Sequence, residues 1–267
     1  MKRILIILVA AVMVLSFAAC GGSKTPENQG NTEKTKFIMG IDPEYPPFSY
    51  LGDDGNYTGF DVEICQAVCD YLGWEMEIFP VNWDEKLIQL DANECDCIWS
   101  GMTILDSMKA EGYVISAPYY DNTQVILVKE GSGIESSKDL EGKLVAVQLG
   151  TSGEALLNGD LSDLKDTFGE LITCNSFLMC FTELSGNSVD AVFVDLPVAA
   201  AYVAQNAGYV IIDEQLGAEQ YGIAFRADDA DLCKAVEDAV AELVANGTYK
   251  EIADKYPDIV NNLLFLN

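Results

Sequence analysis

The chain has 267 residues, with 15 Lys and Arg against 43 Asp and Glu, a net charge of −28 and no histidine. So acidic a surface repels phosphate backbones, which argues against nucleic-acid binding, and the lack of histidine removes the most common general base and metal ligand. About 230 residues follow the N-terminal segments described next, enough for one large or two small domains.

Residues 1–19 predict an export signal peptide. A basic start is followed by an apolar run over 4–18, which is short for a membrane span, and then by two alanines before Cys20. Cys20 is similar to the processing site of bacterial lipoproteins, although Phe17 stands where leucine is usual. We predict lipidation at Cys20, with an ordinary secretory signal as the alternative, and a flexible tether over 20–35. The protein is then expected outside the cytoplasm, anchored to the outer face of the cytoplasmic membrane.

Short apolar, β-branched runs alternate with helical patterns through the rest of the chain. Strands are predicted over 37–41, 76–81, 97–100, 125–129, 144–149, 191–194, 209–212 and 222–225. Helices are predicted over 61–72, with Asp61 as its N-cap and Glu63 on the surface, and over 231–245, ended by Gly247. Such alternation is typical of parallel α/β sheets, which hold ligands at the ends of their strands. The stretch 100–109, SGMTILDSMK, begins at one such strand end.

Seven cysteines remain if Cys20 is acylated: Cys65, Cys69, Cys95, Cys97, Cys174, Cys180 and Cys233. An odd number cannot all pair within one chain, so at least one is free. Their spacings match no zinc pattern, so we predict small buried side chains and no metal site or other cofactor. A pairing of Cys174 with Cys180 stays open.

Several motifs stand in a recognisable order. They are DPEYPPF over 42–48, GFDVEICQAVCDYL over 59–72, SAPYY over 116–120, LEGKLVAVQLGT over 140–151 and SVDAVFVD over 188–195. Together they resemble the extracellular solute-binding proteins of polar amino acid ABC transporters, family 3. The resemblance covers the chain from Phe37 to about Tyr256.

The resemblance implies an α/β fold of the type II periplasmic-binding-protein kind, with two lobes and two hinge strands that close on a ligand. Lobe 1 would comprise 36–122 and 222–267, and lobe 2 would comprise 123–221. The implied function is that of a substrate-binding lipoprotein of an ABC importer, without enzymatic activity. Its partners would be a polar or cationic amino acid, the permease subunits, and the membrane through Cys20.

Four implied site residues are aromatic or acidic. Tyr45 matches the ring that lies on the ligand and Trp83 a second aromatic wall, with core packing as the alternative for each. Asp195 matches the acid that receives the ligand's α-ammonium group. Asp42 matches the acid that meets a cationic side chain, and its alternative is a solvated turn acid.

The rest of the implied site would hold an anionic group of the ligand. Its members are Ser100, Gly101, Thr103, Met108, Thr151 and Ser152. The turn 150–152 would offer backbone N–H groups at a helix start. Met108 stands where the family has an arginine, and Leu105 replaces the usual threonine. Lys109 is adjacent to Met108, but neighbouring residues of a helix do not share a face.

Losing a bidentate arginine would weaken carboxylate binding about 10- to 100-fold. Either the site binds an amino acid through backbone N–H groups, or the ligand is a cationic amine or polyamine without an α-carboxylate. A local slip of the alignment is a third alternative. A dehydratase on the same scaffold, similar to cyclohexadienyl dehydratase, and a ligand-sensing domain are further alternatives. The dehydratase acts on dicarboxylates, for which the missing arginine is a difficulty.

Overall fold

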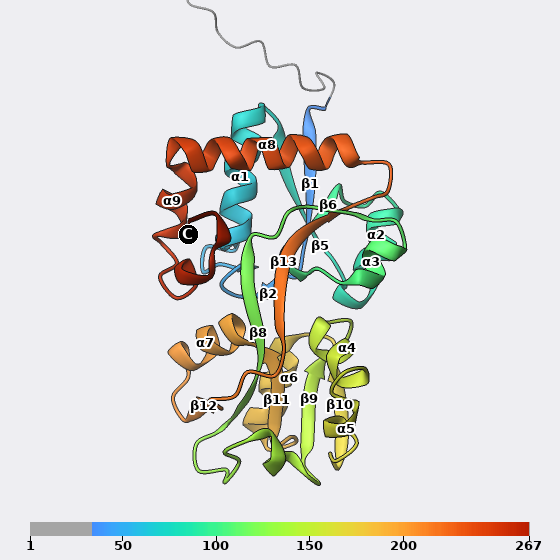
Figure 1. Cartoon of the computed structure of the whole chain (residues 1–267). Coiled ribbons are helices and arrows are strands. Elements are labelled where there is room, and N and C mark those ends of the chain that lie inside the picture. The colour runs from blue at the N-terminus through green and yellow to red at the C-terminus, as the bar shows by residue number, and fades with distance from the viewer. Residues whose placement is uncertain (1–33, 267) are drawn as a thin grey trace, which may run out of the picture. The chain divides into compact units, whose positions relative to one another are not determined.

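The computed structural model describes residues 34–266 (Figure 1). The predicted signal peptide, Cys20 and most of the predicted tether lie outside the described residues. Within 34–266, the helices are all too short or too polar to cross a membrane.

Ten strands form one mixed sheet. The order along its main path is β10-β9-β11-β8-β13-β6-β1-β5, with β12 beside β8 and β7 beside β13. These strands are β1 (Lys36–Ile41), β5 (Glu75–Pro80), β6 (Cys97–Thr103), β7 (Val114–Ile115), β8 (Tyr120–Lys129), β9 (Leu144–Gln148), β10 (Glu170–Cys174), β11 (Ala191–Asp195), β12 (Tyr209–Ile211) and β13 (Ala218–Phe225). A small separate sheet contains β2 (Glu44–Tyr45), β3 (Ser49–Leu51) and β4 (Tyr57–Thr58).

Seven of the described α-helices lie between these strands in the chain, and the last two follow β13. They are α1 (Phe60–Leu72), α2 (Lys86–Asp91), α3 (Asp106–Ala110), α4 (Ser152–Asn158), α5 (Ser162–Lys165), α6 (Phe177–Gly186), α7 (Leu196–Gln205), α8 (Ala230–Asn246) and α9 (Thr248–Ala253). The predicted stop of the long C-terminal helix is confirmed, because Gly247 caps α8 in the left-handed conformation with φ 89°.

The main sheet contains two groups of parallel strands. One group is β5, β1 and β6, and the other is β10, β9 and β11. Between them, β8 and β13 pair antiparallel to each other and to their neighbours, and Figure 1 shows them passing from one group to the other. The carboxyl ends of both groups therefore carry the loops that form the site.

All eight predicted strands are present, but three of them are at least three residues longer than predicted. β8 begins at Tyr120 rather than 125, β13 begins at Ala218 rather than 222, and β6 continues to Thr103 rather than ending at 100. The added segments contain polar or bulky aromatic residues instead of short apolar runs, so their strand character comes from pairing across the sheet.

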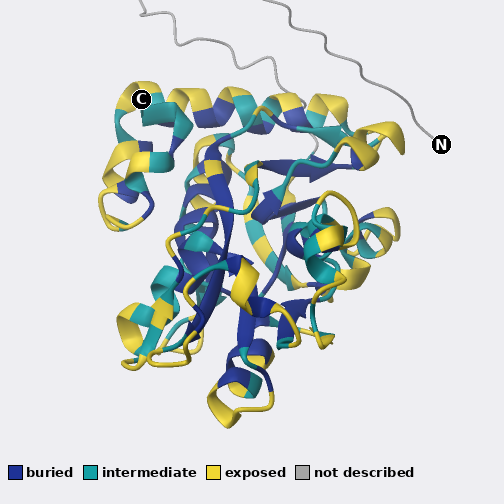
Figure 2. Cartoon of the chain, turned by 60° about the horizontal axis from the view of Figure 1, so that its bottom comes forward, coloured by how far each residue is buried: buried dark blue, intermediate teal, exposed yellow. Residues whose placement is uncertain are grey.

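Side chains alternate between the two faces of the sheet. In β6, Cys97 and Trp99 join the large core under α1 and α8, whereas Ile98 and Met102 join a smaller core with α2 and α3. β11 alternates in the same way between two cores. Figure 2 shows the strands buried and the outer faces of the helices exposed, which is the layered α/β arrangement that the sequence predicted.

The predicted capping role of Asp61 is wrong. Helix α1 begins one residue earlier, with Gly59 as its N-cap at φ 125°, where an added Cβ would lie 2.3 Å from the Phe48 carbonyl oxygen. Asp61 lies in the first turn, fully buried, and its Oδ2 accepts hydrogen bonds from the backbone N–H of Gly101 and the hydroxyl of Tyr119, each at 2.7 Å. Burial raises the pKa of Asp61 to about 7.

The seven described cysteines are all buried and free, which confirms the prediction of small buried side chains. Cys174 and Cys180, whose pairing the sequence left open, are both free thiols.

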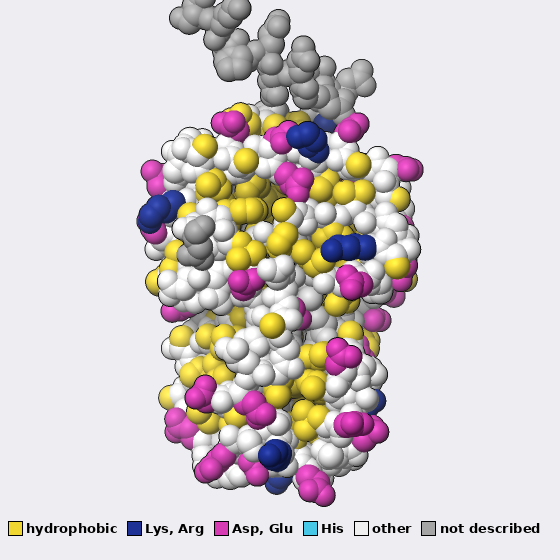
Figure 3. Space-filling model, viewed as in Figure 1, with side chains coloured by type: hydrophobic (Ala, Val, Ile, Leu, Met, Phe, Trp, Pro, Cys, Tyr) yellow, Lys and Arg dark blue, Asp and Glu magenta, His cyan; other side chains and the backbone are white. Residues whose placement is uncertain are grey.

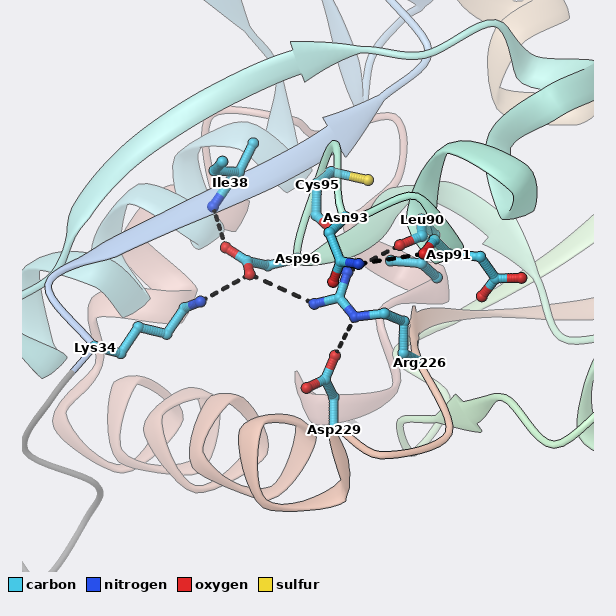
Figure 4. A network of polar contacts seen from close by, with 9 residues as sticks. All are labelled: Lys34, Ile38, Leu90, Asp91, Asn93, Cys95, Asp96, Arg226 and Asp229. Carbon is cyan, nitrogen blue, oxygen red and sulfur yellow. Dashed lines mark hydrogen bonds and ion pairs between the residues drawn. The ribbon is translucent and has the colours of Figure 1, made fainter.

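A polar network at the end of β13 holds the one arginine among residues 34–266. Arg226 Nη1 donates to the backbone oxygens of Leu90 and Cys95 at 2.9 and 2.6 Å, and its Nε lies 2.7 Å from Asp229 Oδ2. Asp96 accepts from Lys34 at 2.7 Å and lies 3.6 Å from Arg226 Nη2 (Figure 4). Arg226 is thus fully engaged in joining the loop before β6 to the start of α8.

Candidate ligand-binding site

A small cavity lies where residues from both groups of parallel strands meet. It is lined by Tyr45, Trp83, Lys86, Gly101, Met102, Thr103, Leu105, Met108, Gly150, Thr151, Ser152 and Asp195. We call it the cleft. Eight of the ten predicted site residues line it, and the other two, Asp42 and Ser100, do not. The space for water-sized molecules is about 30 Å³, enough for one or two waters and too little for an amino acid.

Hydrogen bonds cross the cleft directly. Lys86 Nζ donates to the Gly150 carbonyl oxygen at 2.7 Å, and Thr103 Oγ1 donates to Ser152 Oγ at 3.1 Å. A ligand therefore has to separate these contacts to enter the cleft.

Two aromatic rings line the cleft. The rings of Tyr45 and Trp83 are nearly parallel, at 11°, with centroids 6.5 Å apart. The Tyr45 hydroxyl is 2.7 Å from that of Tyr221, which in turn donates to Asp195 Oδ1 at 3.1 Å. Tyr45 is thus fixed in place by a hydrogen-bonded chain that ends on the acid of the cleft.

Asp195 ends β11 and is only 3% exposed. Its Oδ1 accepts from Asn122 Nδ2 at 2.7 Å and from Gln124 Nε2 at 2.8 Å. The same two amide groups donate to Glu219 Oε1 at 2.6 and 2.9 Å, so two carboxylates share two donors. Burial, followed by the charge of Glu219, raises the pKa of Asp195 well above its ordinary value. This carboxyl group lacks a cationic partner among the described residues.

Asp42 lies beside a second, neighbouring cavity of about 110 Å³, which shares Trp83 with the cleft and is also lined by Glu44 and Gln148. Asp42 Oδ2 accepts from Gln148 Nε2 at 2.7 Å, and its Oδ1 accepts from the Glu44 N–H at 2.9 Å. Burial raises the pKa of Asp42. Asp42 is therefore a buried acid rather than a solvated turn residue.

Ser100 lies beneath the cleft rather than in it. It is fully buried, and its Oγ accepts from the Asp42 N–H at 3.0 Å and hydrogen-bonds to Ser49 Oγ. The contacts of Ser100 fix the loop after β1 against β6. Gly101, the next residue, does line the cleft. It has a φ of 54°, and a Cβ added to it would lie 2.3 Å from the Tyr45 ring.

The turn after β9 was predicted to offer backbone N–H groups to an anion. The N–H of Gly150 instead donates to Glu154 Oε2 at 2.8 Å, and the Glu154 N–H donates to Thr151 Oγ1 at 3.2 Å. A side-chain carboxylate of the chain thus occupies the predicted anion position. Thr151 acts as the N-cap of α4.

Met108 faces the cleft and is buried at 3% exposure, where it packs in the same core as Trp83 and Met102. Leu105 also lines the cleft. Lys109 is exposed and lies outside the cleft lining, as its position beside Met108 predicted.

Several residues of the site were missed from the sequence. Lys86 is three residues after Trp83, and this spacing places both on one side of a helical turn. Asn122 and Gln124 are two residues apart in β8 and therefore lie on one face of the strand. This could be predicted only if the strand was known to begin at 120. Glu219 and Gln148 carried no local signal.

A larger cavity lies elsewhere. It measures about 360 Å³ and is lined mainly by apolar residues, among them Phe60 of α1, Val240 of α8 and Tyr249 of α9. Figure 3 shows this hollow, lined with hydrophobic side chains, below α8. None of its lining residues lines the cleft.

Comparison with known proteins identifies the family. The model of the bacterial extracellular solute-binding proteins, family 3, matches residues 37–258. The L-cystine-binding protein TcyJ of Escherichia coli K12 is 33% identical over 252 residues, which is 93% of this chain and 91% of that protein. The arginine-binding extracellular protein ArtP of Bacillus subtilis 168 is 33% identical over 260 residues, with 96% and 98% covered.

A solved ABC uptake transporter substrate binding protein from Streptococcus pneumoniae, with bound histidine, has a TM-score of 0.79 and 28% identity, covering 83% of this chain and 92% of that one. This likeness confirms the predicted periplasmic-binding-protein fold. All three relatives are binding proteins by name, in agreement with the prediction that the chain is not an enzyme. The chain belongs to the bacterial extracellular solute-binding proteins, family 3.

Proposed function

We propose that the protein is the substrate-binding component of an ABC importer and captures a polar or cationic amino acid for delivery to a permease. The observation that carries this proposal is the buried carboxyl group of Asp195 at the cleft, which has amide donors but no cationic partner among residues 34–266. A ligand ammonium group would supply the missing positive charge. The named ligands of the relatives, which are cystine, arginine and histidine, all carry such a group.

Capture proceeds by closure of two lobes about two hinge strands. We assign 36–122 and 222–267 to lobe 1 and 123–221 to lobe 2. The antiparallel pairing of Ala218 with Thr123 and of Glu219 with Asn122 supports a hinge at β8 and β13. The contacts of Lys86 with Gly150 and of Thr103 with Ser152 then belong to the closed form.

The site residues suggest how the ligand lies. Its ammonium group meets Asp195, and its side chain passes between Tyr45 and Trp83 toward Asp42 and Glu44. Two rings in contact with a planar group are about 7–8 Å apart, twice the usual carbon contact distance, so the observed 6.5 Å between centroids requires only a small opening. Asp42 and Glu44 then favour a side chain that ends in a cation or an amine.

The surroundings of Asp195 and Asp42 contain more hydrogen-bond acceptors than donors. The amide oxygens of Asn122, Gln124 and Gln148 are buried and have no donor among residues 34–266. The carboxylates of Asp195 and Asp42 add to this excess. A ligand rich in N–H groups would satisfy these acceptors, since a buried acceptor without a donor is costly.

The second candidate is a receptor for a cationic amine or polyamine without an α-carboxylate. It is favoured by Met108, which replaces the family's arginine while Asp195 and Asp42 are retained.

We place the protein outside the cytoplasm, attached through a lipid on Cys20 and a tether over 20–35. The sequence pattern around Cys20 supports the anchor, and the family's extracellular character supports the location.

The test is a thermal-shift panel of the purified protein with L-arginine, L-histidine, L-cystine, acidic amino acids and polyamines. A ligand at about 100 times its Kd adds roughly 2.7 kcal/mol to the stability of the folded state. We expect arginine, histidine or cystine to raise Tm. Stabilisation by acidic amino acids alone would contradict the proposal, and stabilisation by polyamines alone would select the second candidate.

A further inference from the structure

A ligand carboxylate in this cleft needs a positive charge, and no arginine of the described part of the chain provides one. Arg226 is the one arginine of residues 34–266, and it is engaged in the network at the far end of β13 (Figure 4). The family's arginine position holds Met108, and Lys109 is exposed away from the cleft. Among the described residues that line the cleft, Lys86 has the one cationic side chain.

Lys86 is the first residue of α2 and is partly buried. Its Nζ donates to the carbonyl oxygens of Trp83 at 3.0 Å and Gly150 at 2.7 Å, and it lies 4.7 Å from the centre of the Trp83 ring. An ammonium group has three N–H donors, so these two acceptors leave one for a further partner. No carboxylate of the described residues lies within ion-pair distance of Lys86, although the protein is strongly acidic.

The electrostatic setting of Lys86 favours an anion beside it. Burial lowers its pKa to about 8, while the more distant charges of Asp84, Asp42 and Glu154 favour its charged form. A partly desolvated ammonium group without an ion pair gains strongly from a carboxylate placed next to it.

We propose that Lys86 receives the α-carboxylate of the ligand in place of the missing arginine, so that the ligand is an α-amino acid rather than a plain amine. This inference rests on the proposed amino-acid-binding function and adds the group that recognises the carboxylate. Lys86 and Asp195 line the same cleft and come from the two different lobes of the proposed closure. A single bound ligand then contacts Lys86 of lobe 1 through its carboxylate and Asp195 of lobe 2 through its ammonium group.

The test compares each amino acid with its decarboxylated amine. The pairs are L-arginine with agmatine, L-histidine with histamine, and L-cystine with cystamine, without thiol reductants. Isothermal titration first establishes which amino acid the wild-type protein binds. The corresponding pair is then measured with Lys86→Met, with Lys86→Gln as a second neutral variant, and with Lys109→Met as a matched control that removes an exposed charge nearby.

We expect Lys86→Met to weaken binding of the amino acid about 10- to 100-fold, the usual contribution of a charge-assisted hydrogen bond. Binding of the amine should be unchanged or tighter, because a like charge has been removed. Lys109→Met should change either affinity by less than about 5-fold. Introducing Met108→Arg into the Lys86→Met protein should restore amino-acid binding.

Two results would overturn the role of Lys86 alone. One is wild-type affinity for the amino acid in both neutral variants. The other is equal weakening of amino acid and amine, which would make Lys86 a contact between the lobes. A wild-type protein that binds none of the three amino acids would instead overturn the proposed function, and with it this inference.

Discussion

Asp195→Asn tests the contribution of the Asp195 charge to ligand binding separately from its contribution to folding. The variant keeps an oxygen that can accept from Asn122, Gln124 and Tyr221, whose donors lie 2.7–3.1 Å from Oδ1. It removes only the charge that a ligand ammonium group would meet. Since burial already raises the pKa of Asp195, the free protein should be as stable as the wild type or more stable.

Binding should fall steeply in this variant. Breaking a buried charge pair costs about 3–5 kcal/mol, which corresponds to a rise of Kd of about 100- to 5,000-fold. At a ligand concentration of about 100 times the wild-type Kd, the wild type gains about 2.7 kcal/mol, and the variant gains about 0.4 kcal/mol or less. For a protein of this size, these gains correspond to shifts of Tm of about 5–11 °C and less than about 2 °C.

The assay is a thermal melt with and without the best amino acid of the panel, and the control is Asp163→Asn, the same chemical change at an exposed site in α5. The control should keep the full shift. If Asp195→Asn also keeps most of the shift, Asp195 does not receive the ammonium group. If the free variant melts many degrees lower, the charge of Asp195 is needed for folding, and the separation of the two roles is wrong.

Three further changes test other parts of the cleft and of the core beneath it. Met108→Arg should tighten binding of the amino acid about 10-fold by titration while leaving its decarboxylated amine no tighter; no change for either ligand would show that position 108 does not reach the carboxylate. Gly101→Ala, whose Cβ would lie 2.3 Å from the Tyr45 ring at φ 54°, should lower stability by about 1–3 kcal/mol and weaken binding, whereas Gly55→Ala, at φ 81° with open space around it, controls for backbone strain alone. Asp61→Asn should flatten the pH dependence of stability: the folded pKa of about 7 exceeds the unfolded value, so the wild type loses about 2–3 kcal/mol from this group between pH 5 and 7.5 and the variant does not. Urea unfolding at both pH values measures this difference. If the free energy of unfolding changes equally with pH in the two proteins, Asp61 is not a buried, neutral group at low pH.

The regular elements were largely predictable from the sequence because their signals are local. Apolar runs marked the strand cores, and helical spacing with Gly247 marked the end of α8. The first halves of β8 and β13 gave no such signal. Their residues pair with each other and include polar groups such as Asn122 and Glu219. These are acceptable there because Asn122 donates hydrogen bonds to both Glu219 and Asp195.

The candidate site was predictable where one motif supplies the residue. Tyr45, Thr151 and Asp195 lie in motifs that resemble the family's, and the structure places all three at the cleft. The partners of Tyr45 and Asp195 were not predictable, because they come from distant segments. Asn122 is 73 residues from Asp195 in the chain, yet it donates to the Asp195 carboxylate.

The sequence by itself determined the family, the alternation of strands and helices, the acidic character and the loss of the ligand arginine at Met108. Only the tertiary structure decided which polar side chains are buried and what they contact. In the structure, Lys86 lines the cleft and Asp42 lines the neighbouring cavity. Asp61, predicted to cap a helix, is a buried acid of the core. The physical reason is that desolvation and hydrogen bonding depend on what covers a side chain, and distant parts of the chain provide that cover.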